Sequence, residues 1–241
     1  VKMEPQLTGD VSMLRTFLAL GAVSALAAPA WAQSEPGSVY FQIDNCASYQ
    51  LPGEPVWETA CAAHDSWSIF LHSTEHGSGI AYAYNGSERT EFYTPPATLL
   101  FGGYHSTMEW RRNESGAYAT IHRYVSEGPS MDVDPNGGPD SGEDQRQDHL
   151  VITALNPDSY ERVACPLFVV DASQISDANE AAQILADTFA PGHVCDDSEA
   201  YVFTDMGEVY ATVEAYDMEM EMNESQGDDA ASPMQPPKSK S

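Results

Sequence analysis

Residues 80–92 read IAYAYNGSERTEF, and this stretch decides the class of fold. Two runs of β-forming side chains flank Asn85 and Gly86, a pair that supplies the two positive φ angles of a type I′ turn. The pattern therefore predicts an antiparallel β-hairpin, in which Tyr82 lies opposite Arg89 on the same face. A sheet that contains such a tight hairpin is at least partly antiparallel.

Similar runs, rich in Val, Ile, Tyr, Phe and Thr and bounded by turn residues, recur along much of the chain. Composition of this kind, with turn residues on either side, is typical of short β-strands. The predicted strands, those of the hairpin included, cover residues 38–43, 67–72, 79–84, 88–93, 107–111, 118–124, 149–154 and 162–170.

One helix is predicted over residues 177–189, which read DANEAAQILADTF. Asp177 is placed to cap its first turn, and Glu180 three residues later completes a capping box. The apolar residues repeat at helical spacing along one face, and Pro191 with Gly192 ends the helix. Strands and helix together predict a single α+β domain, made mainly of antiparallel β-sheet with one packed α-helix.

The four cysteines are predicted to form two disulfides. An even number of cysteines in an exported chain favours disulfides over metal ligation, and the CxxC spacing of zinc and redox sites does not occur. Four cysteines allow three connectivities. We favour Cys46 with Cys61 and Cys165 with Cys195, because each of these pairs flanks a compact segment.

Residues 1–32 are predicted to be an N-terminal extension followed by a secretory signal peptide. The run that begins at Met13 has one basic residue, Arg15, ahead of an apolar stretch that is too short to span a bilayer. A small-residue pattern ends at Ala32, which predicts cleavage before Gln33. The mature protein is then expected to be periplasmic or secreted, and not attached to a membrane.

The 241-residue chain is strongly acidic, with 10 Lys and Arg against 37 Asp and Glu and a formal net charge of −27. Such a chain lacks the clustered basic residues that bind nucleic acid, and anionic membrane surfaces repel it. Hydrophobic residues make up 42%, which is enough for a packed core. We expect residues 33–216 to form the globular domain, with an acidic loop over 127–148, and residues 217–241 to be a disordered acidic tail. The binding partner is left open.

The acidic loop contains one pattern with a chemical mechanism. Residues 132–143 read DVDPNGGPDSGE and match the calcium-loop spacing D-x-[DN]-x-[DN]-G-x₅-E at every position. Pro139 occupies the eighth position and no amphipathic helix flanks the loop, so a solvated acidic loop is the alternative that we favour. Calcium is the one candidate cofactor, and its ligands would be Asp132, Asp134, Asn136, Asp140 and Glu143.

His72, Glu75 and His76 form an H-x-x-E-H sequence, the order of an inverted zinc-protease motif. Such a motif needs a helix to bring both imidazoles to one face, whereas residues 71–79 run from a predicted strand into a glycine-rich turn. A metal-dependent hydrolase that uses these residues is therefore an alternative hypothesis. The sequence has no G-x-S-x-G, phosphate-binding loop or dinucleotide fingerprint, and we name no catalytic residue.

Two predictions concern single residues of the strands. His122 lies in the middle of a predicted strand, where a histidine with a structural partner is expected. In the sequence Glu109-Trp110-Arg111, strand alternation predicts a core position for Trp110 and a surface ion pair between Glu109 and Arg111.

The order of several short motifs resembles a family of small, secreted, uncharacterised bacterial proteins. The family has an EWR…FATI-x-R…LVVT…VDA…DAN…AD…C progression, which this chain follows over roughly residues 106–195. It departs from the family in having Ala-Tyr where the family has Pro-Phe ahead of Ala119. The resemblance implies an exported bacterial origin and no established activity. The matching motifs are Glu109-Trp110-Arg111, Ala119-Thr120-Ile121, Arg123-Tyr124, Leu150-Val151-Ile152-Thr153, Val170-Asp171-Ala172, Asp177-Ala178-Asn179, Ala186-Asp187 and Cys195.

These observations predict an exported bacterial protein with a non-enzymatic role, which binds or shields another molecule in the periplasm. One alternative is a metal-dependent hydrolase that uses His72, Glu75 and His76. The other is a secreted protein stabilised by calcium through residues 132–143.

Overall fold

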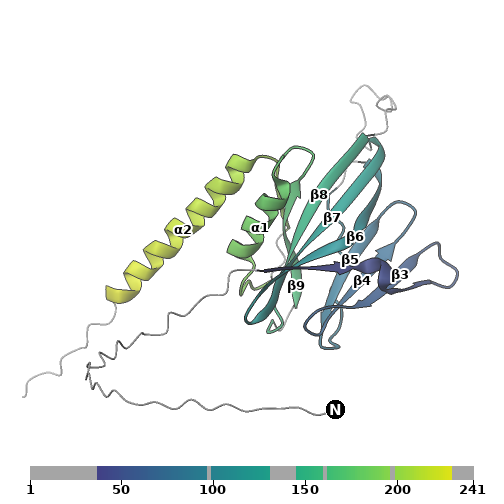
Figure 1. Cartoon of the computed structure of the whole chain (residues 1–241), viewed down its shortest axis with the longest axis horizontal. Coiled ribbons are helices and arrows are strands. Elements are labelled where there is room, and N and C mark those ends of the chain that lie inside the picture. Colours follow the sequence, from purple (N-terminus) through teal and green to yellow (C-terminus); the bar gives the residue numbers. More distant parts are fainter. Residues whose placement is uncertain (1–36, 97–98, 131–144, 160–161, 196–198, 230–241) are drawn as a thin grey trace, which may run out of the picture. The chain divides into compact units, whose positions relative to one another are not determined.

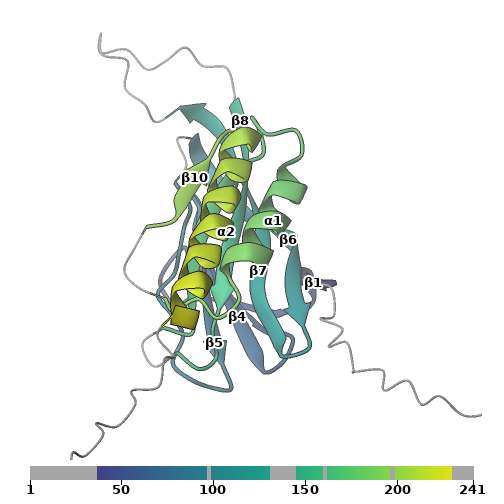
Figure 2. The same ribbon diagram turned by 90° about the vertical axis from the view of Figure 1, so that its left-hand side faces the viewer.

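Two β-sheets face each other, and helices pack against the outer face of the larger sheet (Figures 1 and 2). The predicted signal peptide and the predicted calcium loop lie outside the residues that the structure describes. None of the helices within the described residues is long and apolar enough to cross a membrane. The computed structural model describes residues 37–96, 99–130, 145–159, 162–195 and 199–229.

The larger sheet has six strands, in the order β1-β6-β7-β8-β9-β10. Neighbouring strands are antiparallel except for the last pair, in which β10 runs parallel to β9. The strands are β1 (Gly37–Gln42), β6 (Leu99–Asn113), β7 (Gly116–Ser130), β8 (Gln145–Leu155), β9 (Ala164–Asp171) and β10 (Tyr201–Phe203).

The smaller sheet is an antiparallel meander in which consecutive strands pair. A short 3-10 helix, η1 (Ile43–Asn45), leads into it from β1. Its strands are β2 (Ala47–Gln50), β3 (Trp57–Ala62), β4 (Trp67–Ser73) and β5 (Ser78–Tyr84). The mainly antiparallel α+β class is therefore confirmed.

The predicted Asn-Gly turn forms, but the segment after it returns along β5 irregularly and not as the predicted strand. Asn85 and Gly86 have φ angles of 49° and 76°, as a type I′ turn requires. Residues 87–92 form no regular strand, but backbone hydrogen bonds from Thr90 to Tyr82 and between Tyr93 and Ile80 keep this segment beside the free edge of β5. The prediction that Tyr82 and Arg89 share a face is wrong: Tyr82 contacts Thr120 inside the molecule, while Arg89 covers the outer face of the small sheet.

Helix α1 (Ala178–Phe189) confirms the predicted helix within one residue. Asp177 occupies the N-cap position but makes no side-chain capping hydrogen bond, so the capping box does not form. The face toward the large sheet is rich in alanine, which lets the helix approach the strands closely. The buried residues of α1 are Ala178, Ala181, Ala182, Leu185 and Ala186.

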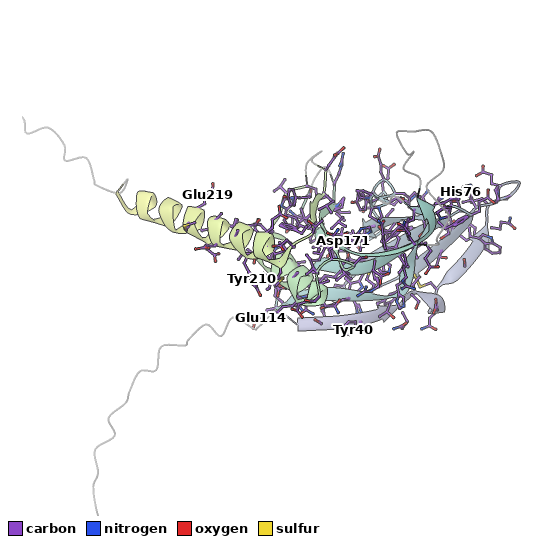
Figure 3. All side chains as sticks on the ribbon, turned by 90° about the horizontal axis from the view of Figure 1, so that it is seen from above. Tyr40, His76, Glu114, Asp171, Tyr210 and Glu219 are labelled. Carbon is purple, nitrogen blue, oxygen red and sulfur yellow. A yellow bond between two sulfur atoms is a disulfide. The ribbon has the colours of Figure 1, made fainter. Side chains whose placement is uncertain are left out.

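A second helix replaces part of the predicted disordered tail. Helix α2 (Met206–Asp229) runs well beyond residue 217, where the sequence predicted disorder. Its first turns are anchored, because Val209 is buried in the core next to α1 and the ring of Tyr216 lies 4.8 Å from that of Phe189. Figure 3 places Glu219 farther along this helix than Tyr210. Packing of its first turns against α1 thus stabilises α2. The sequence of α2 has no apolar periodicity from which the helix could be predicted.

The core is divided by the large sheet. On the helix side, aliphatic residues of β7, β8 and β9 pack against α1 and the start of α2. On the other side, residues of β6 pack against the small sheet, with Trp110, Met108 and Ile69 fully buried between the two sheets. The alternation of side chains along each strand sends neighbouring residues into different halves of the core.

Both predicted disulfides form, with the favoured connectivity. Cys46–Cys61 joins η1 to β3 and belongs to the core between the sheets. Cys165–Cys195 joins β9 to the segment that follows α1 and belongs to the helix-side core. All four cysteines are therefore engaged in disulfides.

Candidate functional site

A cavity of about 430 Å³ opens at the edge where the small sheet meets strands β8 and β9 of the large sheet. Its size falls within the range that small-molecule sites in proteins occupy. Strand β5 and the segment that follows the Asn-Gly turn form one wall, and β8, β9 and residues 199–200 form the other. The lining residues are Ile80, Tyr82, Thr90, Glu91, Phe92, Tyr93, Thr94, Pro96, Thr153, Arg162, Ala164, Cys165, Pro166, Glu199 and Ala200.

Several hydroxyl groups line the cavity beside its apolar side chains, and Tyr82 provides one of them. Tyr82 is 2% exposed, and its hydroxyl shares a hydrogen bond of 2.8 Å with the hydroxyl of Thr120 from β7. Burial raises the pKa of Tyr82 to about 12. The phenol is therefore neutral at physiological pH, and its hydroxyl is engaged with that of Thr120.

A second phenol lies closer to the mouth of the cavity. Burial, together with the negative charge of Glu199, raises the pKa of Tyr93 to about 12. Backbone hydrogen bonds of 2.8 and 2.9 Å between Tyr93 and Ile80 hold this residue against β5. The Tyr104 hydroxyl donates to the Tyr93 carbonyl at 3.3 Å, and this links the wall to β6. The phenols of the lining are thus neutral and are held by the surrounding strands.

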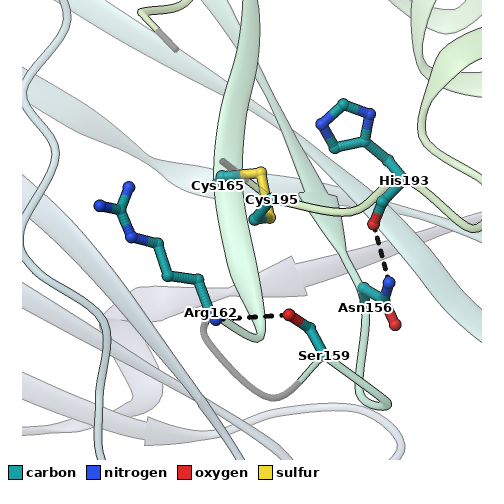
Figure 4. Close-up of a disulfide and its surroundings, with 6 residues drawn as sticks. All are labelled: Asn156, Ser159, Arg162, Cys165, His193 and Cys195. Atoms are coloured by element: carbon teal, nitrogen blue, oxygen red, sulfur yellow. Dashed lines mark hydrogen bonds between the residues drawn. A yellow bond between two sulfur atoms is a disulfide. The ribbon is translucent and has the colours of Figure 1, made fainter. Parts of the chain in front are cut away.

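The opposite wall is braced where β9 begins (Figure 4). The backbone N–H of Arg162 donates to Ser159 Oγ at 3.3 Å, and the Asn156 amide donates to the His193 carbonyl at 2.8 Å. In Figure 4 the Arg162 side chain extends away from the Cys165–Cys195 disulfide. The disulfide therefore forms a fixed wall, while Arg162 brings a positive charge to the cavity.

The three residues of the H-x-x-E-H sequence do not converge on one point. His72 lies on β4, where its Nδ1 is 3.8 Å from a carboxylate oxygen of Glu58 and its ring packs on Phe92. His76 lies in the turn after β4, where it pairs with Glu75 at 3.3 Å. A strand and a turn cannot place both imidazoles on one face, which a helix would do. Among the described residues, no group of three or more His, Cys, Asp or Glu side chains could hold a metal ion.

The predicted structural role of His122 is confirmed. Its Nε2 donates to the carbonyl oxygen of His105 at 2.6 Å, and its ring stacks on Tyr104 at 4.7 Å. Residues 105–107 form a bulge in β6 that faces the single residue Arg123 of β7, and His122 satisfies a carbonyl of this bulge. Burial lowers the pKa of His122 to about 4, so the ring is neutral near pH 7.

Trp110 lies in the core as predicted, but the neighbouring ion pair is not on the surface. Arg111 is 6% exposed and pairs with Glu109 at 3.2 Å and with Asp187 of α1 at 2.6 Å. Tyr118 also donates to Asp187, at 2.6 Å. The prediction of a surface pair is therefore wrong, because α1 packs over this face of the large sheet. The network connects helix and sheet and has a structural role.

The predicted calcium ligands Asp132, Asp134, Asn136, Asp140 and Glu143 all lie outside the described residues. The strands on either side are described, and β7 ends at Ser130 while β8 begins at Gln145. These residues therefore stay a prediction of the sequence.

Sequence reasoning did not find the cavity. Its walls come from segments that are far apart in the chain, and the key residues Tyr93, Arg162 and Glu199 form no local motif. The one local signal is the tyrosine-rich run of β5, since tyrosines of this kind either cover a core or form a ligand platform. Tyr82 is in fact both part of the core and part of the cavity.

Comparisons with known proteins assign no relative to this chain. No family model, no curated protein and no solved structure was found to match it. The resemblance to a family of secreted bacterial proteins is therefore still a prediction from the sequence. Function has to be inferred from the site, because a fold alone does not imply an activity.

Proposed function

We propose that this protein is an exported, non-enzymatic binding protein that holds a small, mainly apolar molecule in the cavity beside β5. The observation that carries the proposal is the chemistry of the lining. Phe92, Ile80 and Pro96 supply apolar surface, and the phenols of Tyr82 and Tyr93 add uncharged polar groups. An apolar site with a few fixed polar groups is typical of small-molecule recognition.

The location proposed for this activity is the periplasm or the exterior of a bacterial cell. Two disulfides are typical of proteins that fold in an oxidising compartment. The predicted signal peptide over residues 1–32 supports the same location. The resemblance to secreted bacterial proteins supports it as well.

Binding of a neutral fluorescent probe tests the proposal. We expect N-phenyl-1-naphthylamine, which brightens in apolar surroundings, to bind the purified protein with saturable fluorescence. Ala200→Trp places a large side chain in the lining and should abolish this signal. Ala215→Trp is the matched control, since this alanine is exposed on α2, away from the cavity. Saturable binding that Ala200→Trp leaves unchanged, or no saturable binding at all, would contradict the proposal.

A second proposal is that residues 132–143 bind calcium and thereby stabilise the protein. Its support is the match of the sequence to the calcium-loop spacing at every position. Calcium at one hundred times its dissociation constant should add about 2.7 kcal/mol to the free energy of unfolding. Thermal unfolding in excess calcium and in chelator measures this, with Glu143→Gln as the variant that should lose the shift. Equal melting temperatures would remove the proposal.

A further inference from the structure

A second cavity, of about 410 Å³, lies next to the first. The two cavities share three lining residues, Thr90, Glu91 and Arg162, so they adjoin along one boundary. A ligand long enough to cross this boundary would occupy both. The second cavity is lined by Ser87, Glu88, Arg89, Thr90, Glu91, Ser159, Arg162 and Val163.

The two cavities differ sharply in chemistry. The first has mostly aromatic and aliphatic walls, with neutral phenols on its floor. The second is lined by two arginines, two glutamates and two serines, and Val163 is its one aliphatic residue among the described lining. The first cavity therefore suits an apolar group, and the second suits a polar group.

Among the described residues, the lining of the second cavity carries charges of both signs. Arg89 and Arg162 face Glu88 and Glu91 around the same space, whereas the whole chain carries a formal charge of −27. An anionic ligand is repelled by the protein as a whole, and a purely cationic ligand would meet the positive charge of Arg162. A group that carries both signs can pair with a guanidinium and with a carboxylate at the same time.

Arg162 is the cation that lines both cavities, whereas Arg89 lines the second cavity and not the first, among the described residues. Arg89 is drawn toward the outer face of the small sheet, where it pairs with Glu58 at 3.3 Å and its guanidinium lies 4.6 Å from the centre of the Phe92 ring. Arg162 lines both cavities, as does Glu91. One positive and one negative side chain therefore stand at the boundary between the apolar and the polar cavity.

We infer that the ligand is a zwitterionic amphiphile, whose apolar chain fills the first cavity and whose head group fills the second. The anionic part of the head lies beside Arg162, and the cationic part lies beside Glu91. This inference rests on the proposed function, because it assumes that the first cavity binds apolar groups. It adds the class of the ligand and the residues that select its head group.

Competition among chain-matched amphiphiles tests this inference. Decylphosphocholine, decanoate, decyltrimethylammonium and decyl maltoside share a ten-carbon chain and differ in the charge of the head group. Each is titrated, below its micelle concentration, into the protein loaded with N-phenyl-1-naphthylamine. We expect the zwitterion to displace the probe at an about tenfold lower concentration than the others, which corresponds to one charge-assisted hydrogen bond.

Two variants assign the effect to Arg162. Arg162→Gln should bring decylphosphocholine to the level of decyl maltoside while probe binding is retained, which shows that the first cavity is intact. Arg112→Gln is the matched control, because Arg112 is a partly exposed arginine that pairs with Asp65 elsewhere.

The outcomes separate this inference from the proposed function. Equal displacement by all four amphiphiles, or tightest binding of an amphiphile with a single charge, would overturn the inference and leave the binding function standing. Loss of the preference in Arg112→Gln as well as in Arg162→Gln would also overturn it. Absence of saturable probe binding to the unaltered protein would instead overturn the proposed function itself.

Discussion

The two faces of the large sheet differ in chemistry although alternate residues of the same strands form them. Toward α1, β8 presents Leu150 and Ile152, which pack against the alanine-rich face of the helix. Toward the small sheet, β7 presents Thr120 and His122, and aromatic rings fill the space around them. The helix side of the sheet therefore provides stability through close packing, whereas the side toward the small sheet combines packing with a cavity.

The two faces of the large sheet also differ in how their buried polar groups are paired. On the helix side, the buried charge of Arg111 has carboxylate partners in Glu109 and Asp187. On the other side, Ser126 Oγ and His122 Nδ1 are buried without a hydrogen-bond partner among the described residues. The two sides therefore differ in how protein groups pair their buried polar atoms.

The largest expected effect compares the two disulfides, one on each side. In the chain-entropy description, the bridge Cys165–Cys195, with a separation of 30 residues, stabilises by about 4 kcal/mol, and Cys46–Cys61, with 15, by about 3 kcal/mol. We therefore expect C165A/C195A to lower the free energy of unfolding more than C46A/C61A. Denaturant unfolding of both double variants measures this, and the reverse order would show that loop length does not govern these bridges.

The second test breaks the charge network on the helix side. Asp187→Ala removes a partner from Arg111 and from Tyr118, so we expect a loss of about 3 kcal/mol in the free energy of unfolding. Glu109 remains beside Arg111, which keeps the loss at the lower end of the range for buried pairs. Arg112→Ala is the control, because its pair with Asp65 is partly exposed and should contribute less than about 1 kcal/mol. Equal losses would mean that α1 does not depend on this network.

The third test uses pH on the side with the cavity. The pKa of His122 is about 4 in the folded protein, below its ordinary value, because burial disfavours the charged ring. The unfolded chain therefore binds the proton more readily, and stability that is complete above pH 6.5 is lost as the pH falls toward 4. The loss from this residue amounts to about 3 kcal/mol.

Substitution isolates the contribution of His122 to this pH dependence. His122→Gln keeps a donor for the His105 carbonyl but cannot titrate, so its stability should fall less between pH 7 and pH 4 than that of the unaltered protein. His149, whose pKa burial also lowers, contributes to the slope that remains. Unfolding midpoints across this pH range provide the measurement. Parallel curves for the two proteins would exclude His122 as a source of acid sensitivity.

The smallest expected effect concerns the floor of the cavity. Tyr82→Phe removes one partner of the buried hydroxyl pair with Thr120, and we expect a loss of about 1 kcal/mol in the free energy of unfolding. Binding of N-phenyl-1-naphthylamine should persist, because the floor becomes more apolar. Tyr40→Phe, at a residue that is 61% exposed, should change stability by less than about 0.5 kcal/mol. Loss of probe binding in Tyr82→Phe alone would assign the phenol a direct part in recognition.

The elements that could be predicted from the sequence are those with strong local signals. Helix α1 has its periodicity and its stop signal within the segment itself, and the Asn-Gly turn needs only two residues. The disulfides followed from the number and spacing of the cysteines. Each of these depends on residues that are close in the chain.

The features that were missed depend on residues far apart in the chain. Helix α2 has no apolar stripe of its own, and it is anchored where Val209 and Tyr216 meet α1. Strand β2, whose four residues are all exposed, has no apolar alternation to predict it. The cavity requires β5 to lie beside β8 and β9, and no local pattern in a single sequence specifies such a neighbour.

The bulge at residues 105–107 also determines where this protein tolerates changes in length. Each half of β6 takes its pairing from β7 independently, with Tyr104 opposite Tyr124 before the bulge and Met108 opposite His122 after it. A residue inserted at positions 105–107 enlarges the bulge. The side chains in both halves of β6 then keep the faces that they have now. The same insertion between Met108 and Arg111 would turn Trp110 toward the helix side of the sheet and bring a charged neighbour into the core between the sheets. The side-chain orientation of each half of β6 is therefore set independently by its pairing with β7. Natural insertions and deletions in this strand should concentrate at the bulge.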